Sequence, residues 1–293
     1  MKAWPLQAKT QGVLAINVAA VIFGTAALYG KLDVSPVWIV AMRAAFGALA
    51  LALVGGFTTS LWAIPAGAWA ILGVSGLLLA AHWLTFFMSV QLAGVAVATL
   101  TFATFPLFTV LVEAARRHRL PGPAELLVGG VIIIAVALLV EPGDGAGNVG
   151  GTVAGLASAL TYALFWRASQ MMEQPLTPAA LSLCQNGIVF ALLVPALFFA
   201  APVPARLGDW LALVALGVFN TAVMLLLYLY ALKRISASTC SGFVALEPVY
   251  AIVFAALLFD EPITPWILVS IVLIIGASLT LLRVERKSLL TAV

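Results

Sequence analysis

The chain has 293 residues, of which 64% are hydrophobic and 9% are charged, and its formal net charge is +3. A soluble domain carries roughly 25% charged residues, so this composition excludes an ordinary soluble protein. Between Ala44 and Val112 there is no Asp, Glu, Lys or Arg at all. That stretch is too long for one buried helix but suits several membrane spans, so the sequence predicts an integral membrane protein that crosses the bilayer repeatedly.

Ten apolar segments follow one another along the chain, each near the roughly 20 residues that a helix needs to cross a bilayer. None alternates apolar and polar residues as the strands of a membrane barrel do, so we expect an all-α fold of ten transmembrane helices. The predicted spans cover residues 11–30, 36–55, 68–90, 94–114, 124–140, 149–171, 178–200, 209–232, 236–259 and 264–282.

If the chain has ten spans, most basic residues fall on one side of the membrane. This distribution explains the positive net charge without nucleic-acid binding. One side holds only Lys31 and Arg206. Because cytoplasmic loops carry the excess of Lys and Arg, we expect both termini in the cytoplasm and the acidic loop at Asp260 and Glu261 outside. The basic residues on the cytoplasmic side are Lys2, Lys9, Arg116, Arg117, Arg119, Lys233, Arg234, Arg283, Arg286 and Lys287.

Prolines recur at a fixed spacing that divides the chain in two. Three of them, Pro36, Pro106 and Pro123, return 142 residues later as Pro178, Pro248 and Pro265 (178−36, 248−106, 265−123). We predict two five-helix repeats, residues 1–145 and 146–293, within one integrated membrane domain. Because five is odd, the second repeat enters the membrane from the opposite face. Such inverted repeats are common in secondary transporters, whose substrate site lies near the midplane and whose access alternates.

Glu247 is the single acid that the sequence places near the centre of the membrane. Burial in hydrocarbon disfavours the charged form of a carboxyl group, so Glu247 is a candidate for taking up and releasing a proton during transport. Alternatively, it binds the ammonium group of a substrate. A structural role also stays open, because Pro248 removes a helix hydrogen bond and Glu247 could satisfy the freed backbone or pair with a basic residue.

Few other polar residues fall within the predicted spans. His82 is the one histidine in a span, and it either contacts a substrate carboxylate or hydrogen-bonds a neighbouring helix. Asn17 and Asn220, in the first and eighth spans, are candidates for the same cavity. Arg43 lies about 10 Å from the outer end of its helix, so we interpret it as a structural residue that extends to the interface or pairs with a helix end.

Aromatic residues gather at similar depth in several predicted spans. A cavity with aromatic walls and a few polar groups would suit a hydrophobic or aromatic zwitterion, because rings bury the side chain while polar atoms replace water around the charges. For each of these rings, the alternative to substrate binding is ordinary packing between helices. The aromatic candidates for substrate binding are Trp83, Phe86, Tyr162, Trp166, Phe243 and Tyr250.

No arrangement of residues predicts an enzyme or a metal site. Cys184 and Cys240 lie in separate apolar spans without Cys/His ligand spacing, so we expect no metal and no cofactor. The run Gly73–Gly76 resembles the serine motif of intramembrane rhomboid proteases, whose histidine must contact Ser75. His82 lies seven residues along the same helix, about 10 Å away, and this distance excludes the protease chemistry.

Two acid–proline pairs carry a resemblance to a known family. Glu247-Pro248 and Glu261-Pro262 resemble the motif in the ninth helix and the acid before the tenth helix of the drug/metabolite transporter superfamily, in particular its ten-helix EamA-type exporters. Arg43 is similar to the family's arginine in the second helix, and the resemblance covers the whole chain.

The first half departs from that pattern. Phe105 stands where the family has Glu before Pro106, and Arg119 stands where Glu261 stands in the second half. Glu247 therefore lacks a symmetric acidic partner, which argues against a mechanism with paired carboxylates.

The resemblance implies a bacterial inner-membrane exporter of small metabolites, with the cavity lined by helices one, three, four, six, eight and nine. It is closest to exporters of aromatic and other hydrophobic amino acids, with protons as a possible coupling ion. Drugs, nucleotide precursors or sugar phosphates remain alternative cargoes, although a phosphate would favour several inward-facing Lys or Arg residues. A receptor or assembly scaffold is the alternative outside transport. The expected partners are the lipid bilayer and a small-molecule substrate.

Overall fold

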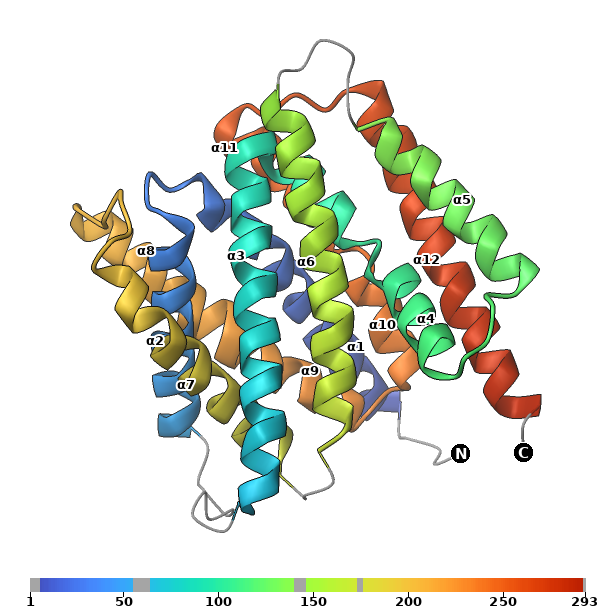
Figure 1. Ribbon diagram of the computed structural model, residues 1–293, viewed down its shortest axis with the longest axis horizontal. Helices are drawn as coiled ribbons and strands as arrows, with labels where there is room; N and C mark the ends of the chain where they lie inside the picture. Colours follow the sequence, from blue (N-terminus) through green and yellow to red (C-terminus); the bar gives the residue numbers. More distant parts are fainter. Residues whose placement is uncertain (1–5, 55–63, 140–145, 173–175, 292–293) are drawn as a thin grey trace.

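The computed structural model describes residues 6–54, 64–139, 146–172 and 176–291, and every regular element in these ranges is helical (Figure 1). The all-α prediction is confirmed for this part of the chain. The α-helices are α1 (Leu6–Thr25), α2 (Pro36–Val54), α3 (Ala66–Phe102), α4 (Phe105–Arg116), α5 (Pro123–Ala137), α6 (Ala146–Gln170), α7 (Pro178–Leu197), α8 (Leu207–Gly217), α9 (Met224–Leu232), α10 (Ala237–Val244), α11 (Glu247–Phe259) and α12 (Pro265–Thr291). A 3-10 helix, η1 (Ala26–Lys31), extends α1, and a π-helical turn, η3 (Val218–Val223), joins α8 to α9.

Proline fixes where several helices begin. Its ring sets φ near the helical value, and its missing N–H would have no partner in the first turn, so it is well suited to the first helical position. At the start of α7, Thr177 adds a cap, because its Oγ1 accepts a hydrogen bond from the Ala180 backbone N–H at 3.2 Å. The helices that begin at a proline are α2, α5, α7 and α12.

Two of the predicted spans are broken. The run of α3 turns at Gly94, whose φ of 85° is strained for other residues, and it ends at Phe102 before α4 begins at Phe105. The predicted fourth span is therefore the last part of α3 followed by α4. The predicted ninth span is likewise split, into α10 and α11. Such breaks are tolerated in a membrane only where the exposed backbone is buried in protein or lines a water-filled cavity.

By length and composition, seven helical segments among the described residues are able to cross a membrane. One of them, Gly67–Phe102, combines the third predicted span with the start of the fourth. The helices Pro123–Ala137 and Pro265–Thr280 are apolar but shorter. The exact number of ten crossings therefore stays a prediction.

Helix starts recur at the spacing of the prolines. Helix α7 begins 142 residues after α2 (178−36), α11 begins 142 residues after α4 (247−105), and α12 begins 142 residues after α5 (265−123). The predicted boundary at residue 145 lies outside the described residues, and the division into repeats 1–145 and 146–293 stays a prediction.

The helices form one bundle around a central apolar core. Helices α3 and α6 run side by side through its middle, α2 lies beside α7, and α5 lies beside α12 (Figure 1). The central core is formed mainly by α2 and α3, with buried residues such as Ile39, Phe87 and Val95. Helix α1 begins and α12 ends at the same end of the bundle (Figure 1).

Helix α6 approaches α3 closely because small residues lie at the contact. A Cβ atom at the buried Gly155 would lie 2.9 Å from Ser89 Oγ and would also overlap Thr101 Oγ1. Small residues allow membrane helices to pack backbone against backbone, and here they bring α6 against the part of α3 that carries His82.

We expect Gly155→Ala to destabilise the protein by about 1–3 kcal/mol relative to Gly187→Ala, because only the first substitution overpacks a helix contact. Gly187 is the matched control: it also lies inside a helix, but a Cβ atom there meets nothing within 4 Å. The helix-propensity gain of about 1 kcal/mol for Gly→Ala is shared and cancels. The measurement is thermal unfolding in detergent; equal stability of the two variants would contradict the packing.

Candidate functional site

His82 lies in α3 with its ring buried against α6. Its Nδ1 atom is 2.8 Å from Ser158 Oγ and 3.1 Å from the Ser158 carbonyl oxygen. The ring centroid lies 4.9 Å from that of Tyr162, 5.0 Å from that of Phe102 and 6.3 Å from that of Phe86. His82 thus makes the helix-to-helix hydrogen bond that the sequence left open, and it does so inside a group of rings.

Tyr162, in α6, joins these rings to the broken helix pair α3 and α4. Its ring centroid lies 5.2 Å from Phe102 and 5.2 Å from Phe105, both edge to face, and 5.7 Å from Phe165. Phe102 and Phe105, on either side of the break, stack at 5.6 Å. We call these six residues the ring cluster: His82, Phe86, Phe102, Phe105, Tyr162 and Phe165.

Arg43 of α2 is buried inside the bundle, with 5% of its surface exposed. Its Nε donates to Thr221 Oγ1 at 3.3 Å, its Nη2 donates to the Asn220 carbonyl oxygen at 3.4 Å, and its Cζ lies 4.1 Å from the centre of the Trp83 ring. The arginine therefore contacts neighbouring helices and does not extend to the interface. The ring under the guanidinium adds a cation–π attraction that is strongest where water is absent.

The π-helical turn η3 supplies both acceptors of Arg43. In a π-turn the hydrogen bonds of the helix shift by one residue, and such turns often occur at functional sites. The Asn220 side chain donates to the carbonyl oxygen of Ile22 and, at 2.9 Å, to Thr25 Oγ1, which ties η3 to the end of α1. The Oδ1 atom of Asn220 is buried and has no hydrogen-bond partner among the described residues.

Glu247, the first residue of α11, is 6% exposed. It interacts electrostatically with Arg43 and Tyr162, without forming a direct ion pair. Helix α1 passes close by, since a Cβ atom at Gly24 would lie 3.2 Å from the Glu247 carbonyl oxygen and 2.6 Å from Tyr250 Cβ. Glu247 therefore lies near both Arg43 and the ring cluster.

Asn17, Phe243 and Trp166 are the remaining predicted site residues. Asn17 bonds within its own helix, donating to the Val13 carbonyl oxygen at 2.8 Å. Phe243 of α10 packs against a separate apolar group that includes Ile16 of α1. Trp166 of α6 is 50% exposed.

Sequence reasoning missed several residues of the site. It treated Phe105 only as the loss of a family glutamate, whereas the ring packs against Tyr162. It did not single out Thr221 or Ser158, because a lone hydroxyl in an apolar span gives no signal of its partner. The available signal was the 142-residue spacing, which makes Phe105 the counterpart of Glu247.

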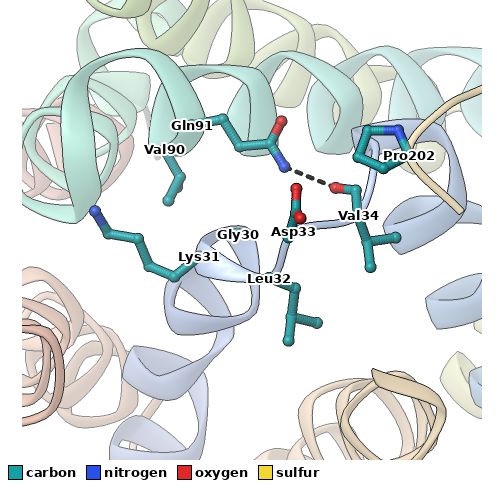
Figure 2. A pocket seen from close by; sticks show the side chains of 8 residues that line it. All are labelled: Gly30, Lys31, Leu32, Asp33, Val34, Val90, Gln91 and Pro202. Carbon is teal, nitrogen blue, oxygen red and sulfur yellow. Dashed lines mark hydrogen bonds between the residues drawn. The ribbon is translucent and has the colours of Figure 1, made fainter. Parts of the chain in front are cut away.

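A cavity of about 320 Å³ lies at the connection between η1 and α2, and none of its lining residues belongs to the ring cluster (Figure 2). Gln91 crosses it and donates to the Val34 carbonyl oxygen at 2.8 Å. Its lining residues are Gly30, Lys31, Leu32, Asp33, Val34, Val90, Gln91 and Pro202. In the described part of the chain, no group of three His, Cys, Asp or Glu residues is placed to hold a metal ion.

Several known proteins are similar to this chain. The uncharacterized transporter YxxF of Bacillus subtilis is 28% identical over 142 residues, 47% of this chain and 46% of that protein. An uncharacterized transporter of Archaeoglobus fulgidus is 24% identical over 61% of this chain and 64% of its own length. One from Clostridium kluyveri is 29% identical over 66% of this chain and 62% of its own length. The matches thus span less than two thirds of each relative.

A solved crystal structure that is 22% identical superposes with a TM-score of 0.63, covering 95% of this chain and 99% of that chain. At that identity the likeness shows the fold alone. The model of the EamA-like transporter family matches residues 10–141 and again residues 149–283. With apolar helices long enough to cross a membrane and a family match over both halves, this multi-pass membrane protein belongs to the EamA-like transporter family.

Proposed function

We propose that the protein is a secondary transporter that exports aromatic or other hydrophobic amino acids by alternating access. The observation that carries this proposal is the convergence of the ring cluster with two buried ionisable residues, Arg43 and Glu247. Rings can bury an apolar side chain, while Arg43 and, when it has released its proton, Glu247 can match the carboxylate and the ammonium of a zwitterion.

The architecture that we propose is ten crossings in two inverted repeats. Three features support it: the equal spacing of helix starts in the two halves, the double match of the family model, and the position of the start of α1 and the end of α12 at one end of the bundle. An odd number of crossings in each repeat then relates the two by a two-fold axis in the membrane plane, with the site between them.

The pairing of positions 105 and 247 supports a site on that axis. Phe105 contacts Tyr162 directly, and Glu247 interacts with the same residue electrostatically. Two equivalent positions, one aromatic and one acidic, thus lie near one side chain. The acid comes from one repeat only, so a single carboxylate serves as the proton carrier in this proposal.

An exporter of drugs or other small metabolites on the same fold is the second candidate. The rings of the cluster would also accept an uncharged aromatic compound. A sugar phosphate is disfavoured, because among the described residues Arg43 is the one buried cation near the ring cluster. We further propose a bacterial inner membrane as the location, with both termini in the cytoplasm, where the basic loops place them.

Uptake of a panel of labelled amino acids into proteoliposomes tests the cargo. We expect the aromatic members to be transported best and Tyr162→Ala to raise their KM by about 10–100-fold, the loss expected for one buried ring contact. His82→Ala should act in the same direction. Trp210→Ala is the control, because Trp210 packs on Trp38 outside the ring cluster. Unchanged KM values in the Tyr162 and His82 variants would show that the pocket lies elsewhere.

Glu247→Gln tests the proton role. We expect a proton gradient to accelerate transport by the parent protein but not by this variant, because Gln cannot take up a proton, while exchange of labelled for unlabelled cargo persists. Glu113→Gln is the control: Glu113 is ion-paired with Arg116 and Arg117 at the end of α4. Normal gradient-driven transport by Glu247→Gln would refute proton coupling through this residue.

A double-mutant cycle measures the coupling between Arg43 and Glu247. We expect Arg43→Gln to destabilise the protein by about 1–3 kcal/mol, because it leaves the buried Thr221 hydroxyl and Asn220 carbonyl without their charged donor. Adding Glu247→Gln should recover about 0.5–3 kcal/mol of that loss. Chemical unfolding in mixed micelles gives the four stabilities, and strictly additive effects would mean that the two residues do not interact.

A further inference from the structure

The cavity between η1 and α2 lies beside a connection whose backbone is held from two sides. The Gln91 side chain of α3 donates to the Val34 carbonyl oxygen at 2.8 Å (Figure 2). The Ser35 backbone N–H donates to the Pro202 carbonyl oxygen at 2.9 Å. Val34 and Ser35 are both buried. The connection, residues 32–35, is therefore anchored on the bundle, and a side chain that it exposes has a fixed starting point.

Asp33 is the acid of this connection, and it lines the cavity as an exposed residue. Its side chain points toward Gln91 (Figure 2). Within the part of the chain that the structure describes, the Asp33 carboxylate makes no hydrogen bond and no ion pair. It does not cap α2, because Ser35 Oγ accepts from the Trp38 backbone N–H at 3.5 Å. Asp33 therefore presents a negative charge that the fold does not use.

The cations outside the described side chains do not reach Asp33. Segments 55–63, 140–145 and 173–175 contain no Lys or Arg. Lys2 lies four residues before α1, a span of at most about 14 Å, whereas Asp33 follows the far end of that 20-residue helix, about 30 Å away. The others belong to the last part of α12, at the end of the bundle where α1 begins (Figure 1): Arg283, Arg286 and Lys287.

Lys31, the cation in the cavity wall, is already paired. Its Nζ forms an ion pair with the Glu261 carboxylate. The two oxygens of that carboxylate also accept from the Val95 backbone N–H, at 3.2 and 3.1 Å, directly after the bend of α3 at Gly94. The Lys31 side chain extends away from Asp33 (Figure 2). Because Glu261 neutralises Lys31, the net charge that the cavity presents is that of Asp33.

The rest of the wall suits a small apolar body. Leu32, Val34, Val90 and Pro202 supply apolar side chains. The volume of about 320 Å³ lies at the lower end of the range for small-molecule pockets, about 300–1,000 Å³. A carboxylate accepts strong, charge-assisted hydrogen bonds from an ammonium group, whereas it repels another anion. The cavity is therefore complementary to a small cation that is apolar at its other end.

We propose that this cavity is a second binding site, lined by neither Arg43 nor Glu247, which takes the primary ammonium group of a small molecule with a short apolar body. Asp33 accepts the hydrogen bonds of the ammonium group, and the apolar side chains cover the body. Since the connection is already anchored, binding orders little of the chain. An amine, an amino acid and an ethanolamine lipid headgroup all carry this group, and the experiment separates them.

Three probes with the same isobutyl body test the charge preference. Isobutylamine carries an ammonium group, isovalerate carries a carboxylate, and L-leucine carries both. Their dissociation constants are measured by saturation-transfer NMR on the full-length protein in phosphatidylcholine nanodiscs. Glu247→Gln serves as the background throughout, because it removes the acid of the central site. We expect isobutylamine to bind at least fivefold more tightly than isovalerate.

Substitutions of Asp33 assign the binding to this cavity. We expect Asp33→Asn to weaken isobutylamine binding about fivefold to tenfold, between the loss for an exposed ion pair and that for a hydrogen bond to a charged group. Asp33→Lys should reverse the preference, so that isovalerate binds better than isobutylamine, a result that a damaged protein would not give. Asp260→Asn is the control: Asp260 is exposed and does not line the cavity, and Asn tolerates its φ of 53°.

The remaining arms identify the source of the ammonium group. Displacement of isobutylamine by L-leucine indicates an amino acid as the ligand, and its displacement by phosphatidylethanolamine in the nanodiscs indicates a lipid headgroup. If neither displaces it, the site takes free amines.

Three results would overturn the proposal. The first is an absence of isobutylamine binding in the Glu247→Gln background, which would confine amines to the central site. The second is equal affinity with and without Asp33, or an unchanged preference in Asp33→Lys. The third is an equal loss in Asp260→Asn, which would show only the general surface charge. Uptake of amino acids is measured separately, so a failure of the proposed cargo and a failure of this site are distinguishable.

Discussion

The constraint on which the centre of this molecule depends is the burial of Arg43. A guanidinium deep in an apolar bundle is costly unless protein groups replace its water, and here they come from several helices. Thr221 and the carbonyl group of Asn220 accept its hydrogen bonds, and Trp83 lies beneath it. These contacts of Arg43 hold α2 against η3 and α3. They also place the guanidinium close enough to Glu247 for an electrostatic interaction. The position of the positive charge in the site thus follows from the hydrogen bonds and the ring contact that Arg43 requires.

Much of the fold could be predicted because a membrane makes strong demands on sequence. Long apolar segments had to be helices, and the prolines marked the starts of α2, α5, α7 and α12. The breaks in the predicted fourth and ninth spans were not foreseen, since hydropathy reports length and polarity but not backbone direction. Gly94 stands in an ordinary apolar run, and only the approach of Glu261 from a distant loop explains its conformation.

The site was predicted in part for similar reasons. His82, Phe86 and Tyr162 were found by their type and depth, and the structure brings them together. Their partners were not found, because which helix faces which is decided by packing across the chain. Ser158 lies 76 residues from His82, and Thr221 lies 178 residues from Arg43. A single sequence carries no record of such pairs.

The π-helical turn η3 has a consequence for the two helices that it joins. A π-turn accommodates one extra residue, and one residue of an α-helix corresponds to a rotation of about 100°. Helices α8 and α9 therefore present faces that a single straight helix could not present together: α8 packs on α2, while α9 packs on α1. The insertion of one residue into a straight helix would rotate the part that follows it, here α9, while leaving its amino-acid composition nearly unchanged. At this position, the rotation of α9 relative to α8 therefore depends on the number of residues in the turn more than on their side chains.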